Sequence, residues 1–321
     1  MKKLLTTIAV VLITVQISLG QISDAEKPPA RTGILLLAHG GKANWNNEVM
    51  KVAAAVDKTA PVEVAFGMAS KRSIQQAIDG LAARGVTEIV AVPLFISSHS
   101  SVITSTEYLL GKRKQAPSEL AAFARMDHGS GSSGSHDSHG STAPPIDPMT
   151  PVVSRIPIRM APALGSHPVV ADILLSRTTD ISTEPANEVV VVVAHGPVSD
   201  DDNERWLADM KLLVDRMRAK SKFKRIEYLT VRDDAPEPIR SRAAAELRGI
   251  VQRAADERSR ALVVPLLLSY GGIEEGVKKR LEGLDFTITG QALLPDERIA
   301  DWVLGSVKNR LGAKIDTKSP D

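Results

Sequence analysis

The sequence predicts an α/β protein made of two tandem, duplicated three-layer domains, each built on a parallel sheet. Residues 33–41 read GILLLAHGG, and a short continuous apolar run is typical of a strand buried on both faces. Residues 189–196 read VVVVVAHG and repeat both the apolar run and the His-Gly end. Strands then alternate with helices in a similar order after each copy, which indicates right-handed β-α-β units.

The first half predicts four strands and four helices. The strands are expected at residues 34–38, 62–68, 89–96 and 156–161, and the helices at 44–58, 70–84, around 107–109 and at 168–177. Ser70 is the expected N-cap of the second helix, and Gly85 follows its end. His167 is expected at the start of the last helix.

The second half predicts the same order of elements. Strands are expected at 189–194, 225–231, 261–268 and 286–289, and helices at 203–219, 236–258 and 295–311. The sequence VPLFIS at 92–97 aligns with VPLLLS at 264–269, which places Gly271 opposite His99. The two halves are therefore expected to share a scaffold but not the second histidine.

The predicted domains are 32–182 and 187–313, followed by a tail at 314–321. Residues 126–151 interrupt the first domain with a Gly/Ser-rich and then Pro-rich tract, which cannot bury enough apolar surface to fold alone. This tract carries His128, His136 and His139. It is interpreted either as a loose, accessory metal-collecting loop or as a flexible linker that happens to contain histidines.

The N-terminus has the features of a secretory signal peptide. Residues 1–20 begin with two lysines, continue as an apolar stretch and end near small residues. The stretch is shorter than the ~20 apolar residues that a membrane span needs, although a single N-terminal anchor is the alternative. We therefore expect export to the periplasm or beyond, a linker at 21–31, and no stable membrane insertion after removal of the signal.

Composition excludes several classes of protein. The chain is 43% hydrophobic and 24% charged, which describes a globular protein rather than a disordered one. Its net charge of +2 is too small to indicate binding to nucleic acid. There is no cysteine, which excludes disulfides, thiolate metal ligands, iron–sulfur clusters and a cysteine nucleophile. Any metal must be held by histidines, carboxylates or the substrate.

His39 and His99 are the leading candidates for chemistry. Each follows a predicted buried strand at the same edge of the first sheet, where open α/β sheets bind ligands. Two imidazoles in one cleft can hold a divalent cation with open coordination positions, or take up protons from a bound ligand. The alternative is that each histidine caps a helix or is satisfied within the core.

These residues carry a resemblance to a known family. The strand ending in AHG, the VPLF strand that leads to a histidine, and the later segment APALGSHPVVADILLSR resemble the sirohydrochlorin cobalto/ferrochelatases, the class II chelatases. The duplication resembles the long, two-domain members, so the resemblance implies two chelatase-like, flavodoxin-like domains.

The resemblance implies a lyase-type metal chelatase that inserts Co²⁺ or Fe²⁺ into sirohydrochlorin or a related tetrapyrrole, on the routes to cobalamin or siroheme. Ni²⁺ also suits two imidazoles. The divalent metal is then a substrate, and neither ATP nor a tightly bound cofactor is implied. In the family, histidines that match His39 and His99 bind the metal and help to remove pyrrole protons. Glu107 on the following helix could support them as an acid or base, or be a solvated carboxylate.

The second half departs from the family pattern because Gly271 and Gly272 replace the second histidine. Protoporphyrin ferrochelatases, which are distant relatives, use a histidine and a glutamate at comparable strand ends. His195 with Glu274 or Glu275 is therefore an alternative site, and a scaffold role as a wall of the cleft is the other interpretation.

Two hypotheses from different classes remain. The first is a monomeric chelatase with a tetrapyrrole and a divalent metal ion as substrates. The second is an exported metal or tetrapyrrole carrier on the same scaffold without turnover, which the signal-like N-terminus favours.

Overall fold

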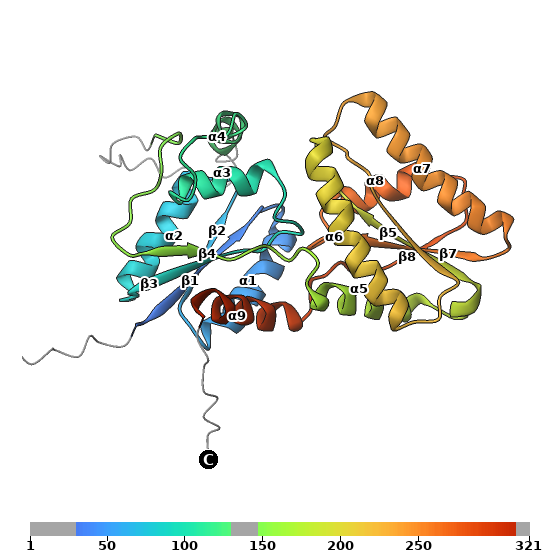
Figure 1. Ribbon diagram of the computed structural model, residues 1–321, viewed down its shortest axis with the longest axis horizontal. Helices are drawn as coiled ribbons and strands as arrows, with labels where there is room; N and C mark the ends of the chain where they lie inside the picture. Colours follow the sequence, from blue (N-terminus) through green and yellow to red (C-terminus); the bar gives the residue numbers. More distant parts are fainter. Residues whose placement is uncertain (1–29, 130–146, 313–321) are drawn as a thin grey trace, which may run out of the picture. The chain divides into compact units, whose positions relative to one another are not determined.

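Each half of the chain forms a four-stranded parallel sheet flanked by helices (Figure 1). The computed structural model describes residues 30–129 and 147–312. The strand orders are β2-β1-β3-β4 and β6-β5-β7-β8, so the same connectivity occurs twice. This repetition confirms the predicted fold class of duplicated α/β units with parallel sheets.

The first half closely follows the predicted order of elements. They are β1 (Thr32–Ala38), α1 (Ala43–Asp57), β2 (Val62–Phe66), α2 (Lys71–Ala83), β3 (Glu88–Pro93), α3 (Ser101–Leu109), α4 (Leu120–Gly129), β4 (Ile158–Met160) and α5 (Pro168–Ile181). Ser70 caps α2 as predicted, since its hydroxyl accepts a hydrogen bond from the Ser73 backbone N–H. Helix α4 is absent from the sequence-based expectation, and β3 ends three residues earlier than expected.

The second half consists of corresponding elements. They are the 3-10 turn η1 (Pro185–Asn187), β5 (Glu188–Ala194), α6 (Asp200–Ala219), β6 (Arg225–Thr230), α7 (Glu237–Asp256), β7 (Arg260–Leu266), α8 (Ile273–Arg280), β8 (Thr287–Ile288) and α9 (Arg298–Leu311). The sequence did not indicate α8, because its eight residues, IEEGVKKR, are mostly charged and carry little apolar periodicity.

The two apolar runs form the central strands, β1 and β5, which pair with a neighbour on each side. Successive side chains of a strand point to opposite faces, so Ile34 and Leu36 join one apolar cluster while Leu35 and Leu37 join another. Helices cover both faces, and for this reason the runs are continuously apolar rather than alternating.

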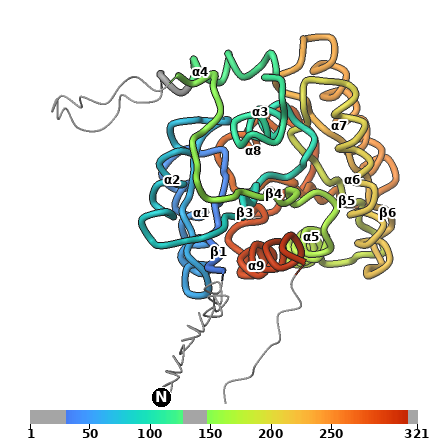
Figure 2. The backbone as a smooth tube through the Cα atoms, turned by 60° about the vertical axis from the view of Figure 1, so that its left-hand side comes forward, coloured from blue at the N-terminus to red at the C-terminus, as the bar shows by residue number. Residues whose placement is uncertain are grey.

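The last helix of each half is exchanged. Helix α5 follows β4 but packs against α6 and β7, whereas α9 follows β8 but packs against α1 and β3. The two helices also contact each other (Figure 2). Their apolar side chains, Ile173 and Val303 among them, belong to one cluster that contains residues of both sheets. The expected boundaries, 32–182 and 187–313, follow chain order and so assign these helices differently from the packing, because either sheet offers a similar apolar face.

Several predictions concern residues outside the described ranges. These are the signal peptide at 1–20, most of the linker at 21–31, His136 and His139, and the tail at 314–321. His128 lies on α4, but its side chain is also outside the description. Within the described ranges, no helix combines the length and apolar character needed to cross a membrane.

Candidate functional site

The two His-Gly motifs meet at one cavity. His39 and His195, which directly follow the central strands β1 and β5, both line a cavity of about 390 Å³. We call it the two-histidine cavity. Most of its other large lining side chains are apolar: Trp45, Leu94, Phe95, Ile96, Trp206, Leu267, Leu268 and Ile273. It lies at the carboxyl ends of the parallel strands, which is where open α/β sheets bind ligands.

His39 is exposed and has one defined ring contact. Its Nδ1 atom lies 2.7 Å from the carbonyl oxygen of Gly40. A carbonyl oxygen can only accept, so Nδ1 carries the ring proton in this contact and Nε2 keeps its lone pair. Gly40 adopts a φ of +78°, which turns the chain sharply after the strand and suits glycine. His39 can therefore offer Nε2 to a metal ion or to a proton.

His195 occupies the equivalent position with different neighbours. Its Nε2 atom lies 3.5 Å from the Asp234 carboxylate, and its carbonyl accepts a hydrogen bond of 2.6 Å from the Arg232 backbone N–H. Gly196 has a φ of +75°, and a Cβ atom there would lie only 2.5 Å from the Cβ atom of Thr230. The second motif thus pairs its imidazole with a carboxylate, unlike the first.

Trp45 forms part of the cavity wall and was not singled out from the sequence. A Cβ atom on Gly41 or on Gly271 would approach its indole ring to 3.3 Å. The ring thus lies beside one glycine of each half. Gly271 is the residue aligned with His99, so the absence of a side chain there leaves room for Trp45. The sequence offered one indication of its role: Trp45 lies only six residues after His39.

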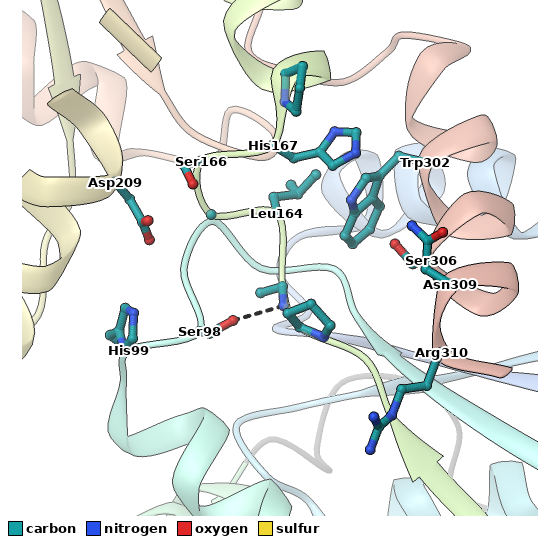
Figure 3. A pocket seen from close by; sticks show the side chains of 14 residues that line it. Ser98, His99, Leu164, Ser166, His167, Asp209, Trp302, Ser306, Asn309 and Arg310 are labelled. Carbon is teal, nitrogen blue, oxygen red and sulfur yellow. Dashed lines mark hydrogen bonds between the residues drawn. The ribbon is translucent and has the colours of Figure 1, made fainter. Parts of the chain in front are cut away.

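His99 does not line the two-histidine cavity. It lines a second cavity of about 630 Å³, together with Asp209 and His167 (Figure 3). The predicted strand runs to residue 96, but β3 ends at Pro93, so His99 follows a loop of five residues instead of a strand end. Its neighbours Ser97 and Ser100 do line the first cavity. His39 and His195 therefore line one cavity, and His99 lines another.

The three predicted carboxylates, of Glu107, Glu274 and Glu275, are not among the groups that line the two-histidine cavity. Glu107 forms an ion pair with Arg113 at 3.7 Å and borders a separate cavity of about 310 Å³. The Glu274 carboxylate accepts hydrogen bonds from the backbone N–H groups that precede α8, which makes it an anchor for that helix. Glu275 pairs with Lys278 at 2.7 Å.

The alternative site of His195 with Glu274 or Glu275 stays a prediction. The structure places Asp234, rather than Glu274 or Glu275, beside His195. His167, by contrast, is the N-cap of α5 as predicted, since its Nδ1 accepts a hydrogen bond from the Val169 backbone N–H. Burial and the nearby Arg216 charge lower the pKa of His167.

Protein side chains alone do not form a metal cage here. In the part of the chain that the structure describes, no group of three or more His, Cys, Asp or Glu side chains is arranged to hold a metal ion. A divalent cation in the two-histidine cavity would be bound by one or two imidazoles and would complete its coordination with atoms of another bound molecule.

Residues 33–181 match the CbiX family model. Just under half of the chain is therefore similar to this family. The curated relatives agree: a sirohydrochlorin cobaltochelatase of Methanothermobacter thermautotrophicus is 32% identical over 92 residues, which is 28% of this chain and 64% of that protein. One of Methanosarcina acetivorans is 39% identical over 72 residues, 21% of this chain and 55% of that protein. The family resemblance drawn from the motifs is confirmed, although the matches span less than two thirds of each relative.

A solved structure extends the likeness to both halves. SirB from Bacillus subtilis with Fe³⁺ superimposes with a TM-score of 0.56 over 87% of this chain and 95% of its own, at 15% identity. At that identity the match establishes the fold alone. Within this chain, each half forms one four-stranded parallel sheet, and the two sheets have the same strand order.

Proposed function

We propose that this protein is a metal chelatase that inserts Co²⁺, or alternatively Fe²⁺, into sirohydrochlorin or a related tetrapyrrole. The observation that carries the proposal is the single cavity that holds the imidazoles of both His-Gly motifs, in a chain with a CbiX-family first half. The curated relatives are named sirohydrochlorin cobaltochelatases, which supports cobalt as the first metal to test.

The reaction needs proton acceptors and a metal ligand, but no phosphoryl donor. Insertion forms bonds from the metal to the pyrrole nitrogens and releases two N–H protons, so the site requires bases that work near neutral pH. His39 presents Nε2 with its lone pair and can bind the incoming cation or accept a proton. His195 lies in the same cavity, 3.5 Å from the Asp234 carboxylate, and is the second candidate proton acceptor.

The cavity walls suit a flat macrocycle. Trp45 and Trp206 are large aromatic groups among apolar side chains, and such surfaces bury the face of a conjugated ring. Lys42 lies on the same wall and can pair with a carboxylate of the substrate. The family-derived roles of His99 and Glu107 stay proposals, to be tested beside those of His39 and His195.

The test is anaerobic absorbance spectroscopy of the purified chain with sirohydrochlorin and Co²⁺. We expect His39→Ala to slow metallation by about 100-fold, the contribution typical of a positioned base. His167→Asn, which keeps a helix-capping side chain, serves as the control. A loss in His99→Ala with full activity in His195→Ala would return the site to the pair expected from the sequence.

The same assay distinguishes the carrier hypothesis from the chelatase hypothesis. Tight binding of the metal or tetrapyrrole without metallation above the spontaneous rate would support an exported carrier and overturn the chelatase. Export itself stays a prediction, which sequencing of the mature N-terminus would test. The metal-collecting role of the tract with His128, His136 and His139 also stays a prediction.

A further inference from the structure

A carboxylate of the second half faces the second histidine of the first half. Asp209 lies on α6, and Figure 3 shows its carboxylate directed toward the imidazole ring of His99 across the wall of the second cavity. The same wall contains Ser166. A Cβ atom on Gly165 would lie 3.4 Å from Asp209 Oδ2, so the backbone passes close beside this carboxylate.

Helix α6 also holds the backbone of His99. The Trp206 indole N–H donates a hydrogen bond of 2.6 Å to the carbonyl oxygen of His99. Trp206 and Asp209 are three residues apart on the helix and therefore lie on the same face. From the other side, Ser97 Oγ accepts a hydrogen bond of 3.1 Å from the His99 backbone N–H. The main chain of His99 is thus hydrogen-bonded to both Trp206 and Ser97.

The position of Asp209 is unfavourable for its own charge. Burial raises the pKa of this carboxyl group, and the His99 charge and the Ser166 hydrogen bond offset the effect only in part. Carboxyl groups with a pKa perturbed in this way are common at functional sites. The other histidine of this cavity, His167, already uses Nδ1 to cap α5.

We propose that Asp209 is a positioning residue for His99: its carboxylate attracts the N–H group of the ring nitrogen that faces it and leaves the other ring nitrogen with its lone pair. Carboxylates orient the imidazoles of metal-binding histidines in this way and fix their tautomer. The second half thereby controls the orientation of a histidine in the CbiX-family half. The catalytic consequence, though not the orientation itself, rests on the proposed chelatase function.

The orientation can be tested without any activity. In the full chain with ¹⁵N-labelled histidine, His99 ring signals, assigned with His99→Gln, should show one dominant tautomer. Asp209→Asn should change the tautomer balance, and Asp209→Glu should largely preserve it. Asp201→Asn removes an exposed carboxylate from the same helix and should leave the signals unchanged. Identical His99 ring signals in the native chain and in Asp209→Asn would overturn the proposal.

Activity and stability provide the second readout. We expect Asp209→Asn to lower the metallation rate about 10-fold, as for other outer carboxylates, and to raise the unfolding temperature because a partly buried charge is removed. A lower unfolding temperature with unchanged ring signals would identify Asp209 as a structural residue and contradict the proposal. If the native chain shows no metallation, the proposed function fails, while the ring signals still decide the role of Asp209.

Discussion

The two His-Gly motifs have the same backbone and different surroundings. Gly40 and Gly196 have nearly equal positive φ values, +78° and +75°, and turn the chain after a central strand in the same way. The His39 ring hydrogen-bonds to the carbonyl of the next residue, Gly40, whereas His195 lies beside Asp234. The two halves therefore share the turn that positions each imidazole. The side chains around the two imidazoles differ, so the cavity is asymmetric.

A similar divergence occurs at the opposite end of the central strands. In the first half, the Thr32 hydroxyl donates to Glu88 on β3 at 2.6 Å. In the second half, fully buried Glu188 stands in the equivalent position and pairs with Arg260 on β7 at 2.6 Å. At this position the second half therefore has a carboxylate, that of Glu188, where the first half has the hydroxyl group of Thr32.

Glu188→Ala should have the largest effect on stability. It leaves Arg260 without its carboxylate and removes the acceptor for the Thr183 and Glu184 backbone N–H groups. We expect a loss of about 4 kcal/mol in the free energy of unfolding, measured with urea near neutral pH. Glu88→Ala should cost only about 1 kcal/mol, since it removes one hydrogen bond. Equal losses would show that the two strand ends are equivalent.

The Glu188 contribution should also depend on pH. Burial raises the pKa of Glu188, but its hydrogen bonds and Arg260 more than offset this and hold the pKa below its usual value. The stabilisation is therefore complete above the ordinary glutamate range and is lost as the pH falls through the lowered pKa. The difference between the native chain and Glu188→Ala should shrink below about pH 4, and a constant difference would contradict the assignment.

Alanine substitutions at Gly40 and at Gly196 compare the turns of the two His-Gly motifs directly. Gly196→Ala should cost about 3 kcal/mol, because it combines a positive φ with a Cβ atom 2.5 Å from Thr230. Gly40→Ala should cost about 1 kcal/mol, because its nearest neighbour, Phe66 Cβ, would be 3.3 Å away. Urea unfolding of both variants measures the difference. A larger cost for Gly40→Ala would mean that the first turn is the tighter one.

Gly271→Ala should have the smallest effect and tests the role assigned to Trp45. We expect a change below about 1 kcal/mol, since the added methyl group displaces the indole by only tenths of an ångström. In protein labelled with 5-fluorotryptophan, the Trp45 resonance, assigned with Trp45→Phe, should move. Gly290→Ala adds a methyl group with no neighbour within 4 Å and is the control. An unmoved Trp45 resonance would contradict the contact.

Local patterns account for most of the agreement between sequence and structure. The paired apolar runs predicted β1 and β5, since a strand buried on both faces needs an unbroken apolar sequence. Ser70 and His167 occupy the capping positions expected of them. Helices α4 and α8 were missed because short or polar helices are stabilised by packing rather than by their own periodicity.

The sequence by itself determined the duplicated α/β fold, the resemblance of the first half to a known family, and His39 as a residue at the mouth of a central strand. Only the tertiary structure decided which residues share a cavity. The loop after β3 takes His99 to the second cavity, and Gly271 admits Trp45 to the first. The exchange of α5 and α9 is also tertiary, because two 14-residue helices with similar apolar faces can each cover either sheet. Distances between side chains that are remote in sequence depend on such choices of packing, and no local pattern records them.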